Sequence, residues 1–343
     1  MSLPVISVIV ISHNKRNFVL DAINSIRQQS LSRDLFEVLV VKDYFDSEID
    51  SSIKESGFES IYTEQKSFQE KMKIGVLSSR GSVLTFLEDD DIYAENRLAV
   101  IYEEFSSDPK LIYFHNSHIP INYLGEILDR SLYYNIEERR IVKPGSEYES
   151  TILKLSRINP DFNTSTMAIR KEVFINSMDY FERITGAVDN FIFLCSVRVS
   201  GKLLFDPRKL TYYRIHSSQT IKHENFEVYM KPRDEKSINL FKSYGILLEM
   251  VENTPGEKYW KNEYYIYKSY LGIFQAANGN KDYLPNFLES IQMLNYSFIS
   301  KRKYILMLVI WIYLFRLLPK VSRYPYYRYK MWELRKVTDN FEK

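Results

Sequence analysis

The 343-residue chain is poor in cysteine, and Cys195 is its only one. A single cysteine excludes an internal disulfide and any zinc site that needs several thiolates. The chain also has no run of about 20 apolar residues, which a membrane-spanning helix requires. No basic stretch precedes the short apolar run at 5–11, so we expect no secretory signal there. From these absences we expect a cytoplasmic protein.

Two glycine-rich nucleotide signatures are missing as well. No G-x-G-x-x-G follows the first apolar run, and G-x-x-x-x-G-K-[ST] occurs nowhere. Both motifs use glycine because the backbone must approach phosphate groups closely. Their absence disfavours a dinucleotide-dependent dehydrogenase and a P-loop nucleotide triphosphatase.

The composition is that of a globular protein, with 45% hydrophobic and 26% charged residues. The length suggests one large domain and a smaller unit. The net charge of +2 is unevenly distributed, because residues 301–336 hold ten basic side chains and one acidic side chain, Glu333. That segment therefore carries a charge of +9, and the rest of the chain carries −7.

The basic segment encloses an apolar run, 304–315, and continues with several tyrosines and Trp332. As a helix extended to Leu318, the run would span about 22 Å, short of a hydrocarbon core of roughly 30 Å. Basic flanks and an aromatic belt suit an anionic headgroup layer, so we expect 301–336 to lie on a membrane surface. The alternative is a core helix with a solvated basic end. No recognition motif supports RNA binding, and we expect no nucleic-acid partner.

Strand and helix patterns alternate over the first 115 residues. Apolar runs predict strands at 5–11, 36–41, 83–87 and 111–114, and apolar spacing predicts helices around 19–26, 71–79 and 98–105. This alternation indicates an α/β fold with a mainly parallel, doubly wound sheet flanked by helices. Residues 116–225 are less regular, and helical spacing returns at 238–251 and 284–294. We therefore expect a first domain at 1–225 and a helical C-terminal unit at 226–343.

Acidic side chains follow two of the predicted strands. Asp43 comes after 36–41, and a run of four, Glu88 to Asp91, comes directly after 83–87. Ligands of an open parallel sheet bind beyond the carboxyl ends of its strands. Adjacent carboxylates repel one another, and a hard divalent cation such as Mg²⁺ or Mn²⁺ would relieve this repulsion and bridge two phosphates. The alternative is a solvated acidic turn.

Three segments, taken in order, resemble the inverting family-two glycosyltransferases of the GT-A fold. They are Val8-Ile-Val-Ile-Ser-His-Asn-Lys15, the strand ending at Asp43, and Gly81 to Ile92 with its Glu-Asp-Asp-Asp run. The stretch from Phe86 to Tyr93 is similar to the spore-coat polysaccharide branch of that family. The resemblance covers residues 4–220. It implies a nucleotide-sugar donor, with uridine as the default base, and a Mn²⁺ or Mg²⁺ cofactor.

The resemblance also implies roles for single residues. The metal ligands would be Glu88, Asp90 and His216, the sugar-binding residue Asp91, and the nucleotide-binding residues Ser12, His13, Asp43, Lys71, Lys73, Asp89 and Arg214. The sequence departs from the family where His13 replaces a tyrosine and where Asp43-Tyr-Phe-Asp46 stands in place of Asp-Asp-Gly-Ser. Arg214 and His216 belong to a segment similar to the loop that folds over the donor. The alternative is that they only brace this loop.

By the same resemblance, Asp189 is the catalytic base. An inverting displacement needs a carboxylate to take the proton of the attacking hydroxyl and a cation to stabilise the departing diphosphate. The family's usual Glu-Asp pair is here Val188-Asp189, so Asp189 would act alone. The alternative is that Asp189 only caps the N-terminus of a helix.

Together these expectations describe a metal-dependent inverting glycosyltransferase. It would move a sugar from a nucleoside diphosphate, UDP by default, to a lipid-linked or glycan acceptor by single displacement. It would work as a peripheral protein at the inner face of the cell membrane. Two alternatives stay open: a nucleotidyltransferase, which would release pyrophosphate, and a non-catalytic scaffold that binds sugar nucleotides. The sequence predicts neither the linkage nor the oligomeric state.

Overall fold

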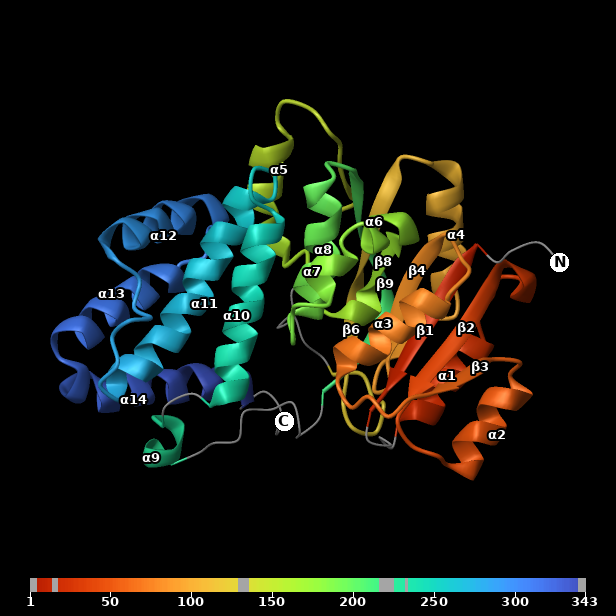
Figure 1. The fold of residues 1–343 in the computed structure, drawn as a ribbon, viewed down its shortest axis with the longest axis horizontal. Coiled ribbons are helices and arrows are strands. Elements are labelled where there is room, and N and C mark those ends of the chain that lie inside the picture. Colours follow the sequence, from red (N-terminus) through yellow and green to blue (C-terminus); the bar gives the residue numbers. More distant parts are fainter. Residues whose placement is uncertain (1–4, 14–17, 129–135, 216–224, 232–233, 339–343) are drawn as a thin grey trace. The chain divides into compact units, whose positions relative to one another are not determined.

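The structure, a computed structural model, describes residues 5–13, 18–128, 136–215, 225–231 and 234–338. The chain divides into two compact units. Unit 1 comprises Met1–Tyr148 and Ile158–His216, and unit 2 comprises Glu149–Arg157 and Ser217–Lys343. Most of helix α5 (Tyr148–Leu155) therefore belongs to the second unit, which the sequence did not predict. Figure 1 shows a sheet with helices in the first unit and helices in the second.

Unit 1 is built on one mixed sheet whose strands are mainly parallel. In spatial order they are β3 (Glu59–Tyr62), β2 (Phe36–Lys42), β1 (Ile6–Ser12), β4 (Val83–Glu88), β8 (Met167–Arg170), β6 (Leu111–Ile121), β9 (Lys202–Arg214) and β5 (Ile92–Tyr93), with β7 (Arg140–Val142) paired to β9. Strands β3, β2, β1 and β4 run parallel, and β8 runs antiparallel between β4 and β6. The predicted α/β class is confirmed. The parallel order brings the carboxyl ends of β1, β2 and β4 to one edge.

Helices cover both faces of the parallel strands. Alternate residues of β1 point to opposite faces, so Val8 and Val10 pack with α1 (Val19–Arg27), α2 (Ser47–Glu55) and α4 (Arg97–Ser107). On the other face, Ile9 lies under Gly75 of α3 (Phe68–Ser78). A Cβ added at Gly75 would lie 2.5 Å from Ile9 Cγ2, so glycine allows α3 to approach the sheet closely. This approach carries Lys71 of α3 to the ends of β1 and β2.

The region 116–225, which is irregular in sequence, contains much of the sheet. β6 continues to Ile121 through four buried polar residues, 115–118, and β9 contains a bulge between Asp206 and Lys209. Buried polar residues and a bulge interrupt the alternation of apolar and polar side chains, so the sequence pattern predicted neither the full β6 nor β9. The region also forms α6 (Lys171–Ile175), α7 (Met178–Phe181) and α8 (Val188–Arg198).

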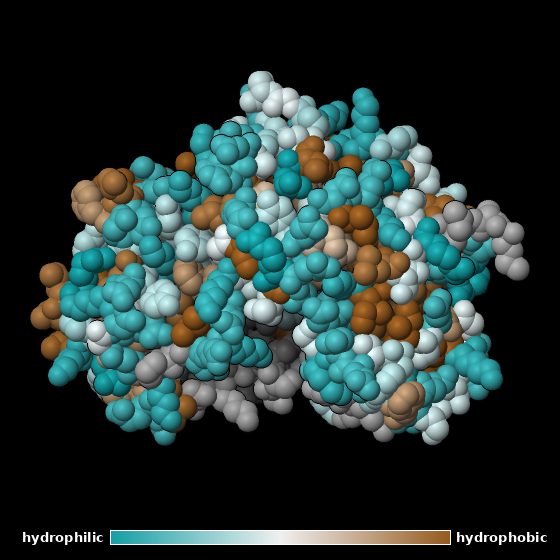
Figure 2. All heavy atoms as spheres, viewed as in Figure 1, coloured by the Kyte–Doolittle hydropathy of each residue, from teal (hydrophilic) through white to brown (hydrophobic). Residues whose placement is uncertain are grey.

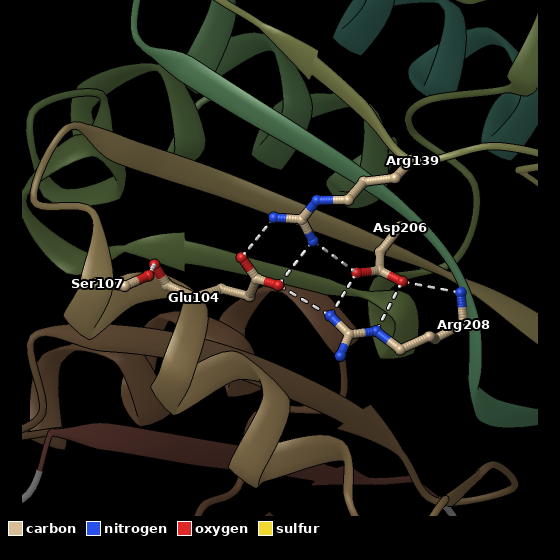
Figure 3. Close-up of polar contacts among 5 residues, drawn as sticks. All are labelled: Glu104, Ser107, Arg139, Asp206 and Arg208. Atoms are coloured by element: carbon tan, nitrogen blue, oxygen red, sulfur yellow. Dashed lines mark hydrogen bonds and ion pairs between the residues drawn. The ribbon is translucent and has the colours of Figure 1, made fainter.

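An ion-pair network ties β9 to α4 and to the chain ahead of β7 (Figure 3). Glu104 of α4 accepts hydrogen bonds from Arg139 at 2.7 and 2.8 Å and from Arg208 at 2.9 Å. Buried Asp206 accepts from Arg208 at 2.6 and 2.9 Å and from Arg139 at 3.3 Å. Two carboxylates thus neutralise two guanidinium groups at the β9 bulge. The network fixes the strand that ends at Arg214.

The described part of unit 2 is helical. Besides α5 it contains α9 (Phe226–Tyr229), α10 (Glu235–Met250), α11 (Glu257–Ala277), α12 (Phe287–Ser300), α13 (Tyr304–Leu317) and α14 (Pro319–Thr338). One apolar core joins most of these helices, and α13 contributes one of its faces to it. The predicted helical C-terminal extension is confirmed. No helix in the described ranges is both long and apolar enough to cross a bilayer.

Candidate active site

The carboxyl ends of β1 and β4 are joined through Asp89. Its Oδ2 accepts a hydrogen bond from the Ser12 hydroxyl at 3.0 Å and another from the His13 backbone N–H at 2.7 Å. The Ser12 hydroxyl oxygen also lies 2.5 Å from the Tyr44 hydroxyl oxygen. Three of the predicted nucleotide-binding residues therefore meet at one point of the sheet edge.

Asp43, directly after β2, is held by two lysines. Lys71 Nζ lies 2.8 Å from its Oδ1, and Lys66 Nζ lies 3.2 Å from its Oδ2. Burial opposes ionisation of Asp43, but the hydrogen bonds from these lysines outweigh it and lower the pKa of Asp43 to about 2. Lys71 is buried and also donates to the Ser12 carbonyl at 2.9 Å, and its Nζ lies 3.1 Å from His13 Nδ1. Asp43 is therefore a fixed carboxylate beside Ser12 and His13.

Lys73, the other predicted lysine, pairs with Glu182 at 2.7 Å. Residues two apart on a helix point in directions about 200° apart, so Lys71 and Lys73 face different surroundings. Of these two lysines, the geometry favours Lys71 for the site.

The carboxyl groups at and directly after the end of β4 lie in different surroundings. Glu88 accepts a hydrogen bond from the Thr164 hydroxyl at 2.8 Å, and Asp91 accepts one from Asn163 Nδ2 at 2.9 Å. Burial, and then the charge of Asp90, raises the pKa of Glu88 well above its usual value and that of Asp91 to about 7. Glu88 and Asp91 therefore resist losing their protons unless a positive charge lies beside them.

The family resemblance implies a divalent metal at this cluster. Among the residues that the structure describes, no three His, Cys, Asp or Glu side chains are arranged to hold an ion. The donor chemistry does fit Mg²⁺ or Mn²⁺, because the cluster offers carboxyl oxygens, and burial together with the charge of Asp90 raises the pKa of Glu88 and Asp91. A partial ligand set suits an ion that takes further ligands from water and phosphate. His216, the third predicted ligand, lies outside the described residues.

Asp189 lies in the first turn of α8. Ala187 occupies the N-cap position, with φ 60° and ψ 39°, so the alternative that Asp189 caps the helix is wrong. A left-handed alanine is strained, and such strain clusters at functional sites. Asp189 Oδ1 accepts a hydrogen bond from the Asn190 N–H at 2.9 Å, and Asn190 Nδ2 donates to Asp161 at 2.7 Å. Burial, and then the charge of Asp161, raises the pKa of Asp189 to about 7.

One cavity connects Glu88, the first residue of the acidic cluster, with Asp189. It has a volume of about 270 Å³ and is lined by Glu88, Thr164, Asp189, the N-terminal residues of α3 and the segment 185–188. Drug-sized ligands occupy pockets of roughly 300–1,000 Å³, so this cavity suits one sugar ring better than a whole nucleotide sugar. Two carboxyl groups that lie far apart in the chain therefore line one cavity.

Arg214, at the end of β9, is buried and anchors the acidic cluster. Its Nε donates to the Asp90 carbonyl at 2.9 Å, and its backbone N–H donates to Asp91 at 3.0 Å. Its two terminal nitrogens contact an Asp21 oxygen at 2.8 Å and the Tyr123 carbonyl at 2.9 Å. Because these bonds occupy the guanidinium, the geometry favours the bracing role over the predicted phosphate contact.

The sequence did not single out four residues of this region: Lys66, Asp161, Asn163 and Thr164. The last three lie in a polar run, 159–166, which was the only available signal. Nothing in that run indicates which strand end it meets, because its contacts with β4 and α8 depend on tertiary packing.

The first half of the chain is similar to a known protein family. Residues 7–176 match the model described as glycosyl transferase family 2. An "uncharacterized glycosyltransferase" of Rickettsia bellii (strain RML369-C) is 25% identical over 128 residues, which are 36% of this chain and 18% of that protein. The match therefore spans less than a fifth of the length of that relative.

Solved structures show a similar fold. TarS 1–349 from S. aureus, in complex with UDP-GlcNAc, has a TM-score of 0.54 at 13% identity, covering 96% of this chain and 91% of that one. The mannosyltransferase PcManGT from Pyrobaculum calidifontis, in complex with GDP-Man and Mn²⁺, has a TM-score of 0.51 at 11% identity, covering 93% and 88%. At such low identity the likeness is one of fold, and it confirms the expected GT-A class.

Proposed function

We propose that this chain is an inverting glycosyltransferase that uses a nucleotide-sugar donor. The premise is that the chain belongs to glycosyl transferase family 2, whose model matches residues 7–176. The observation that carries the proposal is the single cavity lined by Glu88 and Asp189. A sugar ring in this cavity would have the acidic cluster on one side and a titrating carboxyl group on the other. The complexes of TarS with UDP-GlcNAc and of PcManGT with GDP-Man support this donor class, and UDP is the default nucleotide.

Asp189 is the general base of the proposed reaction. In a single displacement the acceptor hydroxyl attacks the anomeric carbon while the bond to the diphosphate breaks, and the configuration of that carbon inverts. Asp189 takes the hydroxyl proton onto its carboxylate. A pKa of about 7 suits this role, because the carboxylate is then basic enough to hold a proton and is still substantially ionised at neutral pH. The hydrogen bond from the Asn190 N–H orients the carboxylate.

The nucleoside site is formed by Ser12, His13 and Asp43, which surround the end of β1. Lys71 contacts all three and keeps them together. Asp89 contributes at the ribose, and its hydrogen bonds with Ser12 and His13 fix its orientation. Mutation of these residues is expected to weaken donor binding rather than the chemical step.

The acidic cluster would hold the metal ion through Glu88 and Asp90, with Asp91 facing the donor sugar. When bound, Mg²⁺ or Mn²⁺ would neutralise charge on the diphosphate. The chain's own contribution is to fix the cluster: Thr164 orients Glu88, and Arg214 holds the backbone of Asp90.

The acceptor is proposed to be a lipid-linked or other glycan, and the chain to act as a peripheral protein at the inner face of the cell membrane. Support comes from the basic, aromatic segment 301–336, which suits an anionic headgroup layer. A membrane-bound acceptor would then reach a nucleotide sugar delivered from solution.

A donor panel tests the function. The full chain is incubated with nucleotide sugars, Mn²⁺ or Mg²⁺ and lipid-phosphate or oligosaccharide acceptors, and nucleoside diphosphate release is measured beside the product's anomeric configuration. Release of nucleoside diphosphate with an inverted glycoside supports the proposal. Release of pyrophosphate would indicate nucleotidyl transfer instead, and donor binding without turnover would indicate a scaffold.

A further inference from the structure

Helix α12 has its apolar side turned toward solvent. The buried residues of this helix are Ser290, Met293, Tyr296 and Ser300. Its large exposed hydrophobic residues are Phe287, Leu288, Ile291, Phe298 and Ile299. An ordinary surface helix places the apolar side on the core and the polar side in water. The apolar spacing at 284–294 thus predicted the helix correctly. Most of the apolar side chains that form this spacing are exposed, however, and do not pack in the core.

Helix α13 extends this apolar surface. One side of α13 packs in the core of unit 2 through Ile305, Leu308, Ile312 and Phe315. The opposite side exposes Met307, Ile310, Leu314 and Leu317, and the same spacing continues to Val321 at the start of α14. The core-helix alternative from the sequence therefore describes only the inner face. The outer face has no covering element among the described residues of unit 2.

Two hydrogen bonds bring the start of α12 next to the end of α13. An Arg316 terminal nitrogen donates to the Pro285 carbonyl at 2.6 Å, and Lys281 Nζ donates to the Arg316 carbonyl at 2.7 Å. The exposed residues at these two helix ends are Phe287, Leu288, Leu317, Leu318 and Val321, which we call the apolar tip. Leu288, Leu317 and Val321 are 74%, 72% and 69% exposed. Figure 2 shows hydrophobic side chains gathered at the left of the view, over the part of unit 2 where Figure 1 labels α12 and α13.

The charge around the apolar tip is mainly basic, although exposed Asp282 lies beside Lys281 and Glu289, which pairs with Lys268, follows Leu288. Between Glu289 and Glu333 the sequence contains no acidic residue and eight basic ones. Lys281, which donates to the Arg316 carbonyl, and Lys320, which precedes Val321, are exposed. Isolated exposed apolar side chains are normal, but a contiguous group with a charged rim is typical of an interaction site.

We propose that the apolar tip inserts into the headgroup layer of an anionic lipid bilayer, with the basic residues around it contacting lipid phosphates. This inference rests on the membrane association in the proposed function and names its contact surface, while it is independent of sugar transfer. A second copy of the chain is a poorer occupant, because pairing two such faces would bring two basic rims together. α13 is about 21 Å long and packs one face on protein, so the tip lies in the interface without crossing it.

Vesicle binding by the full chain tests the inference. The test variant combines Leu288→Ser, Leu317→Ser and Val321→Ser. The matched control combines Leu77→Ser, Leu124→Ser and Ile127→Ser, three exposed apolar residues of unit 1. With vesicles of phosphatidylglycerol and phosphatidylcholine in equal parts, we expect the test variant to bind at least about tenfold more weakly than wild type and the control to bind like wild type. Binding should also weaken with added salt and on pure phosphatidylcholine.

A second readout locates the contact. A Leu317→Cys variant carries an environment-sensitive fluorophore, and the native Cys195 is buried. Its emission should shift to the blue on anionic vesicles, while a Leu77→Cys label should not respond. Equal vesicle binding by the test variant, or equal binding to neutral and anionic vesicles, would overturn the inference. The wild type could instead fail to bind vesicles and form a dimer in light scattering that the test variant does not form. That result would show that the apolar tip contacts a second copy of the chain and not a bilayer.

The outcome is separable from that of the proposed function. Asp189→Asn should bind vesicles like wild type, and the test variant should still release nucleoside diphosphate with a water-soluble acceptor. Loss of vesicle binding with transfer intact is predicted for the test variant. If the wild type binds vesicles but transfers no sugar, the membrane contact of the apolar tip is supported and the proposed sugar transfer is contradicted.

Discussion

Replacing Asp189 by asparagine separates catalysis from structure. Asparagine keeps the shape of the side chain and an oxygen that can accept the hydrogen bond from the Asn190 N–H, which is 2.9 Å long in the wild type. It removes the basic carboxylate that lines the cavity with Glu88. Removal of a general base lowers turnover by roughly 10²- to 10⁴-fold. Donor affinity should stay unchanged, because the proposed nucleoside site lies at Ser12, His13 and Asp43.

Asp189→Asn should lower turnover but raise the free energy of unfolding at neutral and alkaline pH. Burial and Asp161 raise the pKa of Asp189 to about 7, so the folded protein prefers the protonated form. The wild type therefore loses stability as the pH rises from the unfolded pKa of Asp, about 3.9, to about 7, and does not regain it above. Above pH 7, Asp189→Asn removes this penalty and should be more stable by about 2 kcal/mol, after allowance for solvent screening. Below about pH 4 the two proteins should be equally stable.

The assay is nucleoside diphosphate release from about pH 5 to about pH 9, with donor binding measured by calorimetry and unfolding followed by circular dichroism. For the wild type, log kcat should rise with pH and level off above an apparent pKa of about 7. Asp189→Asn should show a low rate at every pH. A variant that keeps most of its turnover, or a wild-type rate that stays flat down to about pH 5, would refute the role of Asp189.

Three further outcomes are expected. Asp161→Asn removes a negative charge near Asp189, so the acidic limb of the wild-type rate profile should move to lower pH while the rate above pH 7 stays similar. Lys71→Met leaves the buried Asp43 carboxylate with Lys66 as its remaining ion-pair partner, so unfolding should become easier by about 3 kcal/mol and donor affinity should fall, as measured by denaturation and calorimetry. Retained stability in Lys71→Met would contradict the ion-pair argument. Gly75→Ala would place a Cβ 2.5 Å from a methyl group of β1, so a loss of about 1–3 kcal/mol is expected, and an unchanged melting temperature would show that α3 can shift.

The central strands could be predicted because of their surroundings. β1, β2 and β4 are parallel and buried, so each reads as a continuous aliphatic run. The acidic cluster was predictable for the same reason, since polar residues directly after such a run must lie at the carboxyl edge of the sheet. The full extents of β6 and β9 were not predictable, because buried polar residues in β6 and a bulge in β9 interrupt the alternation of apolar and polar side chains that marks a strand.

The sequence also could not predict the direction in which several functional side chains point. The sequence could not tell Lys71 from Lys73, because only the packing of α3 on β1 decides which lysine faces Asp43. The burial of Arg214 depends on Asp21 and Tyr123, which lie far from it in the chain. Likewise, the spacing of α12 predicts a helix with one apolar side but not that this side faces solvent.

The central claim is that Glu88 to Asp91 and Asp189 form one active site for a nucleotide sugar. The most direct test is a crystal structure of the chain with a hydrolysis-resistant nucleotide sugar and Mn²⁺. We predict the nucleoside beside Ser12 and Asp43, the diphosphate and ion beside Asp90, and the sugar ring in the cavity with its anomeric carbon facing Asp189. A donor bound elsewhere, with the cavity still empty, would contradict this account.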